Sequence, residues 1–353
     1  MSAVPRVALI GCGRIGQLHA RNLAAMRDMC EFAAVADWNL EAAETAARLL
    51  DVPHATSASE DLLASPDVDA VIIASSTDTH ARFIEIAARH GKDIFTEKPI
   101  ALDIEATERA LEAVADAGVR LQVGFQRRFD SGYIAAREGI EQGEIGNVEM
   151  IRDAMRDPSP PPPEYIRQSG GLYRDMAIHN FDSVRWLMGE DPVEIYTTAS
   201  ALVSEDIREA HDVDTSIVTM RFPSGAIASI ENSRRSGFGY DVRTEIFGST
   251  GALMVGEYRY TPIRRFSGAG VLEDHQYFFL ERFRDAYRNE MVSFLTALIN
   301  DTDVPVSGAD GRAALVIAYA AEQSLREHRP IAIDMKEPDR ARSEHHADSL
   351  PTS

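Results

Sequence analysis

Three side chains in two separate segments could together remove a proton and stabilise a negative oxygen: Lys98, Asp175 and His179. Lys98 belongs to a Glu-Lys-Pro triplet at residues 97–99, and the chain has only two other lysines. Because lysine is rare in this chain and Pro99 follows directly, Lys98 is better explained as an ammonium group with a specific position than as an exposed charge on a loop. Such a group can donate a hydrogen bond to an oxygen on which negative charge develops. Pro99 would hold this loop in a fixed conformation, including a cis peptide bond.

Asp175 and His179 lie four residues apart, so on a helix they share one face. A carboxylate beside a histidine fixes the tautomer of the ring and stabilises the imidazolium, as a general base requires. Two other interpretations remain open: an exposed ion pair between neighbouring helical turns, and a metal site that also uses Asp182. The metal site is less favoured because no cysteine or second histidine completes a ligand set. We therefore predict no metal ion.

A third polar cluster lies in residues 231–243, where a short glycine-containing turn is flanked by hydrogen-bonding side chains. Four of them could supply fixed donors and acceptors for a hydroxylated ligand: Asn232, Arg234, Tyr240 and Asp241. The competing interpretation is a β-hairpin with a solvated charged face.

A glycine-rich loop, Gly-Cys-Gly-Arg-Ile-Gly at residues 11–16, follows the apolar run 6–10 and precedes residues with helical apolar spacing. This strand–loop–helix order is typical of a dinucleotide-binding unit. Gly11 permits the tight turn, Gly13 lets the backbone approach a pyrophosphate, and Gly16 lets the helix pack closely. The free N–H groups of the helix N-terminus then face the phosphates. The residues expected to bind the cofactor here are Gly11, Gly13, Arg14, Ile15 and Gly16.

Asp37 follows the second predicted strand, residues 32–36, where an acidic side chain can accept both hydroxyls of the adenosine ribose. The next residues are Trp38 and Asn39, so no basic side chain is at hand to accept a 2′-phosphate. The sequence therefore favours NAD over NADP. The alternative role for Asp37 is to cap the helix that follows.

Strand and helix patterns alternate through the first third of the chain, which predicts a doubly wound parallel sheet in an NAD-binding Rossmann domain at residues 1–125. The further strands are expected at residues 69–74, 92–95 and 120–123, with helices at 81–90 and 104–117. Ligands bind beyond the carboxyl ends of such strands. The polar residues expected to contact the cofactor in these loops are Ser75, Thr77, His80, Glu97 and Lys98.

Residues 126–335 are predicted to form a second, substrate-binding and oligomerisation domain of α/β type. The proline run 158–163 is expected at the surface, followed by a mostly helical segment, 164–188, interrupted by two glycines. Alternating patterns then predict an open, largely antiparallel sheet. Its strands are expected at 193–202, 213–222, 226–232, 241–247 and 252–255, with closing helices at 281–300 and 309–328. The polar tail, residues 336–353, is predicted to be disordered.

Composition narrows the class of protein. The 353 residues include 36 basic and 56 acidic side chains, a net charge of −20, which argues against binding to nucleic acids or anionic membranes. No apolar run approaches the length of a membrane-spanning helix, and no leader segment is recognised. Cys12 and Cys30 are too few for a disulfide framework, so we expect free thiols and a cytoplasmic location.

Three of these features together resemble the GFO/IDH/MocA oxidoreductases, the family of glucose–fructose oxidoreductase and inositol dehydrogenase. They are the glycine loop with Asp37, the Glu-Lys-Pro triplet, and the Asp-x-x-x-His pair. The resemblance covers about residues 5–330. Longer stretches are similar to the inositol 2-dehydrogenase branch of the family: residues 127–133, 156–182, 231–251 and 281–290.

The resemblance implies that Lys98, Asp175 and His179 act together, with His179 as the base and Lys98 on the reacting oxygen. It implies an open sheet that forms the interface of a homotetramer. It also suggests substrate contacts by Arg128, Tyr240 and Tyr287, which join Asn232 from the polar cluster as predicted substrate residues. Asn180 departs from the aspartate found there in many inositol dehydrogenases, which leaves the sugar open.

The expected activity is therefore NAD-dependent oxidation of a cyclic polyol, an inositol such as myo- or scyllo-inositol, to the keto-inositol. An alternative is oxidation of an aldose such as glucose at its anomeric carbon. A non-catalytic NAD-binding regulator is less favoured, because it would have no need of the three catalytic side chains.

Overall fold

The computed structural model describes residues 4–256, 261 and 263–335. Its described residues group into two compact units. The first combines Met1–Gln126 with Asp285–Ala313, and the second combines Arg127–Arg284 with Ala314–Ser353. The sequence assigned residues 285–313 to the second domain, whereas the contacts group them with the first. The predicted tail, residues 336–353, lies outside the described residues.

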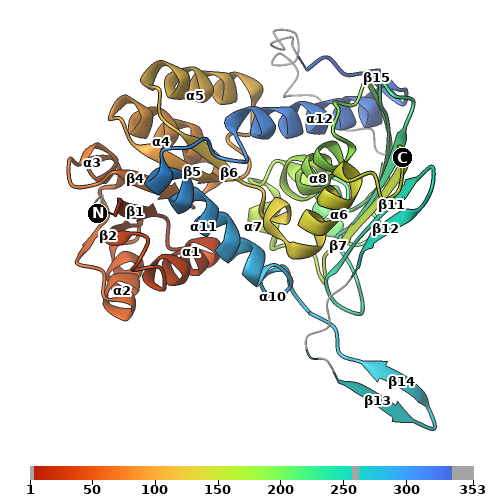
Figure 1. Ribbon diagram of the computed structural model, residues 1–353, viewed down its shortest axis with the longest axis horizontal. Helices are drawn as coiled ribbons and strands as arrows, with labels where there is room; N and C mark the ends of the chain where they lie inside the picture. The colour runs from red at the N-terminus through yellow and green to blue at the C-terminus, as the bar shows by residue number, and fades with distance from the viewer. Residues whose placement is uncertain (1–3, 257–260, 262, 336–353) are drawn as a thin grey trace. The chain divides into compact units, whose positions relative to one another are not determined.

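The first unit contains a six-stranded parallel sheet in the order β3-β2-β1-β4-β5-β6, the doubly wound order of a dinucleotide-binding fold (Figure 1). Its strands are β1 (Arg6–Ile10), β2 (Glu31–Ala36), β3 (His54–Thr56), β4 (Ala70–Ile73), β5 (Asp93–Glu97) and β6 (Leu121–Gly124). Its helices are α1 (Arg14–Ala24), α2 (Leu40–Leu50), α3 (Ser59–Ala64), α4 (Thr77–Arg89), α5 (Ile104–Ala117) and α11 (Arg284–Asn300). Strand β3 and helix α3 were not predicted, because both are short and their apolar residues show little periodicity.

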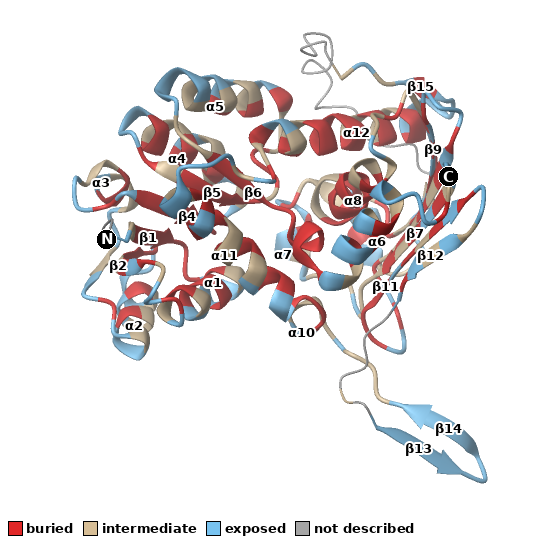
Figure 2. Ribbon diagram, viewed as in Figure 1, coloured by how far each residue is buried: buried red, intermediate tan, exposed pale blue. Residues whose placement is uncertain are grey.

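Both faces of this sheet are covered, so its central strands are buried, as Figure 2 shows for β1, β4 and β5. Strand β4 is accordingly an unbroken apolar run. Helix α11 returns from far along the chain to complete this core. Its residues Met291, Phe294 and Leu295 pack in one cluster with Leu23 of α1 and Phe95 of β5. The carboxyl ends of the strands are thus held on a rigid base.

The second unit contains a seven-stranded mixed sheet in the order β12-β11-β7-β10-β9-β8-β15. Its strands are β7 (Val148–Arg156), β8 (Glu194–Ser200), β9 (Thr215–Arg221), β10 (Ile227–Ser233), β11 (Asp241–Gly248), β12 (Ala252–Val255) and β15 (Ile331–Ala332). All neighbours are antiparallel except β7 and β10, which are parallel. Buried and exposed residues alternate along β9, β10 and β11, so one face of the sheet is packed and the other is open.

The second unit also contains helices, several of which pack against the sheet. They are α6 (Ser131–Glu141), α7 (Pro163–Ile166), the π-helix η2 (Leu172–Ala177), α8 (Ile178–Met188), α9 (Glu205–Glu209), α10 (Phe279–Arg282) and the larger part of α12 (Gly308–Glu327). The short 3-10 helix η1 (Gln126–Phe129) leads into the unit. The predicted helical segment with its two-glycine interruption is confirmed, since Gly170 and Gly171 both have positive φ angles immediately before η2.

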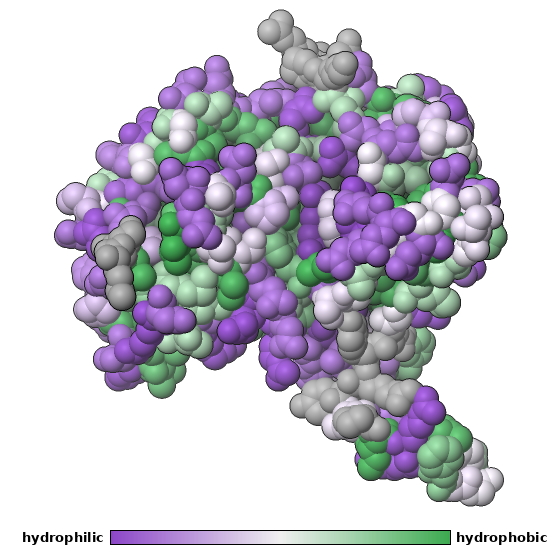
Figure 3. Space-filling model, viewed as in Figure 1, coloured by the Kyte–Doolittle hydropathy of each residue, from purple (hydrophilic) through white to green (hydrophobic). Residues whose placement is uncertain are grey.

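Several elements of the second unit were not predicted, among them β7 and a separate hairpin. Strand β7 carries charged residues at outward positions and lies between β10 and β11, so residues 231–243 do not form a hairpin. A separate two-stranded hairpin, β13 (Arg264–Ser267) and β14 (Gly270–Glu273), follows β12. Its strands are exposed on both faces, and hydrophobic atoms are visible on it in Figure 3.

Candidate active site

The glycine loop between β1 and α1 has the geometry that its sequence predicts. Gly11 has φ +103°, and a Cβ there would lie 2.5 Å from the Ala74 carbonyl oxygen. A Cβ on Gly16 would lie 1.9 Å from the Gly11 carbonyl oxygen, so both positions require glycine. Gly13, in contrast, has open space where a Cβ would stand. It is also the N-cap of α1, and no side chain caps that helix. The bare N-terminus and the open space suit a pyrophosphate.

Asp37 lies at the end of β2 and is nearly buried. Its Oδ2 accepts a hydrogen bond from the Cys12 backbone N–H at 2.6 Å, and its Oδ1 accepts one from the Asn39 N–H at 2.9 Å. Asn39, not Asp37, is the N-cap of α2, because its side chain accepts from the Glu41 N–H. The capping alternative for Asp37 is therefore wrong. Its carboxylate instead ties the glycine loop to the end of β2.

His80 connects two of the strand-end loops. Its Nδ1 lies 2.9 Å from the carbonyl oxygen of Pro99, and its Nε2 lies 3.1 Å from that of Ser75. Burial lowers the pKa of His80, so near pH 7 the ring is neutral and donates through one nitrogen only. The Ser75 hydroxyl bonds the Thr79 hydroxyl at 2.6 Å, and Thr77 begins α4. In this structure His80 supports the loops through backbone carbonyls.

Lys98 follows directly after β5 and is half-buried. The Lys98–Pro99 peptide bond is cis, as the sequence allowed. Glu97, the residue before Lys98, is nearly buried, and its Oε1 pairs with Nε2 of His19 at 2.7 Å. His19 lies on α1 and was not singled out in the sequence, because its partner is far away along the chain.

Asp175 lies in the π-helix η2, and His179 lies in the first turn of α8. A π-helical turn contains more residues than an α-helical one, so spacing in the sequence alone does not fix which side chains share a face. The Asp175 carboxylate accepts from the Tyr165 hydroxyl at 2.8 Å and from Nη2 of Arg234 at 3.1 Å. Arg234, predicted as a ligand group, instead holds Asp175. Tyr165 was not predicted at all.

A buried polar network lies directly after His179. Nδ2 of Asn180 donates to Oδ2 of Asp153 at 2.8 Å, and Oδ1 of Asn180 accepts from Nδ2 of Asn232 at 3.0 Å. Arg127 completes the network through an ion pair with Asp153 at 3.3 Å. Oδ1 of Asn232 is buried and makes no hydrogen bond among the described residues. This network places an amide oxygen, ready to accept, one hydrogen bond away from the neighbour of His179.

The other predicted substrate residues also have protein contacts. Arg128 is buried and pairs with Asp182, with Nε 2.9 Å from Oδ2. Tyr240 is buried, and its ring packs 6.3 Å from that of Phe283.

Two further positions complete this comparison with the sequence. Tyr287 lies on α11 in the first unit, 6.1 Å from the His19 ring. Asp241 pairs with Arg156 and Arg243, which neutralise its charge.

The sequence left open a metal site formed by Asp175, His179 and Asp182, and the contacts of Asp182 bear on it. Asp182 is engaged by Arg128, a guanidinium that would repel a cation. Among the described residues, the one cluster with spacing suited to a metal comprises His19, Glu97 and Glu290, all buried and all in the first unit. The sequence analysis did not find Glu290.

Cys12 and Cys30 are free and buried. Burial raises the pKa of the Cys12 thiol to about 12, with a smaller contribution from the charge of Asp37, and raises that of Cys30 to about 11. Both thiols are therefore protonated and unreactive near neutral pH. Within the described part of the chain, no helix combines the length and the apolar character needed to cross a bilayer.

Comparison with known proteins agrees with this organisation. Residues 5–125 match the model of an oxidoreductase family with an NAD-binding Rossmann fold, and residues 133–254 match the GFO/IDH/MocA C-terminal domain. The chain is 44% identical to an inositol 2-dehydrogenase of Rhizobium meliloti, over 93% of this chain and 99% of that protein. It is 40% identical to a myo-inositol 2-dehydrogenase of Thermotoga maritima, over 93% and 98%.

A solved structure extends the comparison to a ligand complex. It is scyllo-inositol dehydrogenase from Lactobacillus casei with bound NAD(H) and scyllo-inositol, which superposes with a TM-score of 0.87 at 28% identity. The similarity covers 94% of this chain and 99% of that one.

Proposed function

The chain belongs to the GFO/IDH/MocA oxidoreductase family, and from this premise we propose that it is an NAD-dependent inositol dehydrogenase. It would oxidise one hydroxyl of a cyclic polyol such as myo- or scyllo-inositol to the ketone. The observation that carries the proposal is similarity to inositol dehydrogenases along almost the whole chain, including both units. A shared Rossmann domain alone would leave the substrate open.

The first unit fits NAD at the residues that the sequence singled out. Open space at Gly13 and the uncapped N-terminus of α1 can accept the pyrophosphate. Asp37 offers carboxylate oxygens to the adenosine ribose, while the backbone N–H of Cys12 holds it in place. When bound, NAD supplies the hydride acceptor.

We assign the proton transfer to His179. In its neutral form the imidazole accepts the hydroxyl proton while the hydride leaves the same carbon. Asp175 stabilises the resulting imidazolium by its negative charge. Tyr165 and Arg234, which both donate to Asp175, hold that carboxylate in a fixed orientation.

Lys98 is assigned to the reacting oxygen. Its ammonium donates a hydrogen bond to that oxygen as the proton leaves, and so stabilises the developing negative charge. The half-buried position of Lys98 makes this interaction stronger than it would be in bulk water.

A neutral polyol offers no charge to bind, so its recognition depends on several hydrogen bonds. Of the four predicted substrate residues, Asn232 is the one bonded to the residue next to His179, because its Nδ2 donates to Oδ1 of Asn180. That Arg128, Tyr240 and Tyr287 contact the substrate is proposed from the family resemblance. Arg128 already donates to both carboxylate oxygens of Asp182.

The test is a spectrophotometric assay of NADH formation with NAD and a panel of inositols and aldoses. Turnover with myo- or scyllo-inositol, and none with glucose, is the expected result. Preference for an aldose would replace the proposed substrate class while keeping the mechanism. NAD binding without turnover of any polyol would favour a regulator.

We further propose that the chain acts in the cytoplasm as a homo-oligomer, a tetramer or a dimer. The open face of the second sheet supports assembly, because it exposes large apolar side chains: Tyr196, Ile217, Ile227, Phe247 and Met254. The β13–β14 hairpin also supports it, since a two-stranded ribbon alone is marginally stable in water. Light scattering after size-exclusion chromatography measures the oligomeric state directly, and a monomeric mass would contradict the proposal.

A further inference from the structure

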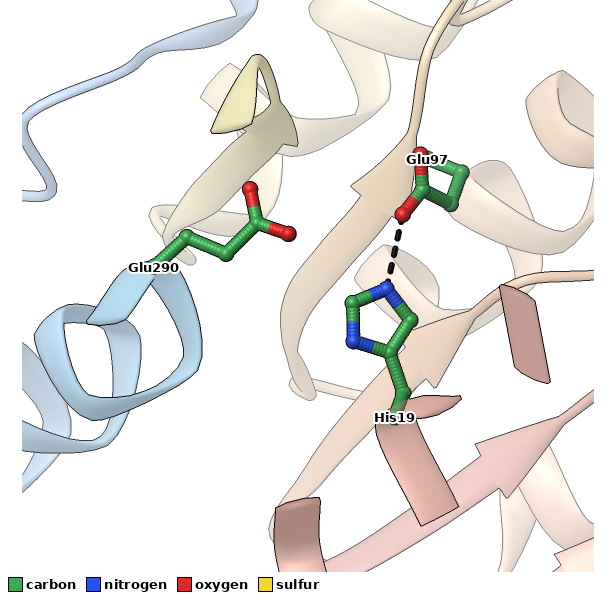
Figure 4. Close-up of side chains that lie close together, drawn as sticks. All are labelled: His19, Glu97 and Glu290. Carbon is green, nitrogen blue, oxygen red and sulfur yellow. Dashed lines mark hydrogen bonds and ion pairs between the residues drawn. The ribbon is translucent and has the colours of Figure 1, made fainter. Parts of the chain in front are cut away.

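Three polar side chains from distant parts of the sequence meet inside the first unit. His19 comes from α1, Glu97 from the end of β5, and Glu290 from α11. Nε2 of His19 lies 2.7 Å from Oε1 of Glu97. One ligand atom from each of the three residues lies within 4.8 Å of the others. Figure 4 shows the Glu290 carboxyl group directed toward the hydrogen-bonded pair.

The surroundings hold this cluster in place. Nε2 of Gln122, on β6, donates to the Glu290 backbone carbonyl at 2.9 Å, which anchors the turn of α11 that carries Glu290. The His19 ring contacts Phe95 edge to face, with centroids 5.3 Å apart. The Glu97 carboxylate lies against Gly124, where a Cβ would be 3.1 Å from Oε2. Residues of α1, β5, β6 and α11 therefore surround this cluster.

The charge of the cluster is unbalanced if both carboxyl groups are ionised. Glu290 is fully buried, and neither of its carboxyl oxygens makes a hydrogen bond among the described residues. Nδ1 of His19 is also buried without a hydrogen bond, so the ring has one engaged nitrogen, the one that donates to Glu97. A neutral ring of this tautomer leaves no positive charge to compensate Glu290.

Electrostatics indicate how the imbalance is removed. Burial raises the pKa of Glu290 well above its usual value, and the negative charge of Glu97 raises it further. When two carboxyl groups share such a site, one of them keeps its proton. Glu290 is the one expected to do so, because Glu97 already accepts a hydrogen bond from His19.

We propose that Glu290 is a positioning residue: it carries a proton, donates that proton as a hydrogen bond toward Glu97, and thereby fixes the end of β5 from which Lys98 projects. The donation spans a gap of at most 4.8 Å, which a rotation of the side chain or one bridging water closes. Glu97 directly precedes Lys98, so displacement of the Glu97 carboxylate moves the backbone that aims the ammonium. Glu290 also closes the 281–290 stretch singled out by the sequence, and this role explains a buried acid there.

The effect on turnover rests on the proposed function of Lys98, but the protonation of Glu290 does not. The first experiment is therefore infrared spectroscopy of the whole protein at pH 7. Glu290→Gln should remove one carbonyl stretch of a protonated carboxylic acid from the wild-type spectrum. The control, Glu105→Gln, changes an exposed residue at the start of α5 and should remove only an ionised carboxylate signal.

The second experiment compares two substitutions in steady-state assays. Gln keeps a neutral hydrogen-bond donor and should retain most of kcat, whereas Glu290→Leu should lower kcat by up to about 100-fold. The KM for NAD should change little in both, because the glycine loop and Asp37 are untouched. NAD binding, measured by fluorescence titration, shows whether the leucine variant is folded.

Three results would overturn the proposal. One is an unchanged acid carbonyl band in Glu290→Gln, which would mean that Glu290 is ionised. A second is wild-type kcat in Glu290→Leu. A third is a stoichiometric metal ion in the purified protein that is lost on Glu290→Gln, because the cluster would then be a metal site. Failure of the proposed function gives a different pattern: the infrared band behaves as expected and NAD binds, but no inositol is oxidised.

Discussion

Buried charge is arranged differently in the two compact units. In the second unit, Asp153 lies beside the guanidinium of Arg127, and Asp182 lies beside that of Arg128. All four side chains are buried. In the first unit, two buried carboxyl groups, Glu97 and Glu290, cluster with the ring of His19.

The two arrangements respond to protons in different ways. Burial raises the pKa of Asp153, but Arg127 opposes this effect, and donors on Thr244, Asn180 and Ser183 add to the opposition. For Glu290 the same effect of burial is reinforced by Glu97. A guanidinium stays charged at every accessible pH, so the second network contains a fixed positive charge, whereas the first depends on a bound proton.

Each network adjoins a proposed catalytic residue in the sequence. Asn180 follows His179 directly, and Glu97 precedes Lys98 directly. The comparison suggests that charged side chains hold the segment of His179 in the second unit. In the first unit, a protonated carboxyl group holds the segment of Lys98. Five changes test this difference, from the largest expected effect to the smallest.

His179→Ala should reduce kcat by about 10²–10⁴-fold, the usual loss for a missing general base. In the wild type, kcat should rise with pH through the neutral range as the imidazole loses its proton. The pH profile of kcat, measured for both proteins, checks the assignment. If the variant keeps the same rise with pH, another group is the base.

Arg127→Met breaks the network of the second unit and should lower the free energy of unfolding by about 3–5 kcal/mol, because Asp153 is left buried without its counter-charge. Arg152→Met is the matched control, since Arg152 is exposed and pairs with Glu245 at 3.4 Å. That change should cost no more than about 1 kcal/mol. Denaturation of both variants provides the comparison, and equal losses would show that burial of the ion pair is unimportant.

Lys98→Ala should lower kcat by about two to three orders of magnitude, since one donor to the developing oxyanion is lost. NAD binding should persist, because the glycine loop and Asp37 hold the other end of the cofactor. Lys98→Arg should not restore activity, as a planar guanidinium cannot replace a compact ammonium. Near-normal kcat in the arginine variant would show that any positive charge at this position is sufficient.

NAD should be preferred over NADP by at least about tenfold in kcat/KM, or about 1.4 kcal/mol. Asp37 would repel a 2′-phosphate by its like charge. Asp37→Ala should lower the ratio of kcat/KM with NAD to that with NADP, mainly because NAD binds more weakly. Loss of the hydrogen bond to the Cys12 N–H will also loosen the glycine loop. Equal efficiency of the two cofactors in the wild type would contradict the ribose assignment.

The smallest effect concerns the pH dependence of stability. A carboxyl group whose pKa is raised on folding stabilises the protein fully below its unfolded pKa, and this contribution is lost as pH rises toward the folded value. The groups facing Glu290 are His19 and Glu97. The melting temperature of Glu290→Gln should therefore improve relative to the wild type as pH rises from 5 to about 8. A constant difference across this range would indicate that Glu290 does not titrate with folding.

Much of the first unit could be predicted from the sequence, because its signals are local. Unbroken apolar runs indicate buried parallel strands, and the spacing of Gly11, Gly13 and Gly16 indicates a turn that leads into a helix. Asp37 and the Glu-Lys-Pro triplet follow strands directly, so the parallel topology brings both to the same edge of the sheet. Strand β7 was missed because the charged Asp153 occupies a buried position and the apolar Met150 and Ala154 occupy outward ones, so the apolar–polar alternation is broken.

Only the tertiary structure decided which distant side chains meet. Asp175 is held by Tyr165 and Arg234, and Glu97 meets His19 and Glu290, from segments separated by whole elements. Such meetings depend on how helices and strands pack against one another, which sequence periodicity does not specify. The sequence by itself determined the family, the sheet that carries the glycine loop and the residues available for catalysis. Packing determined which buried carboxyl groups meet a guanidinium, as Asp153 and Asp182 do, and which lie together, as Glu97 and Glu290 do.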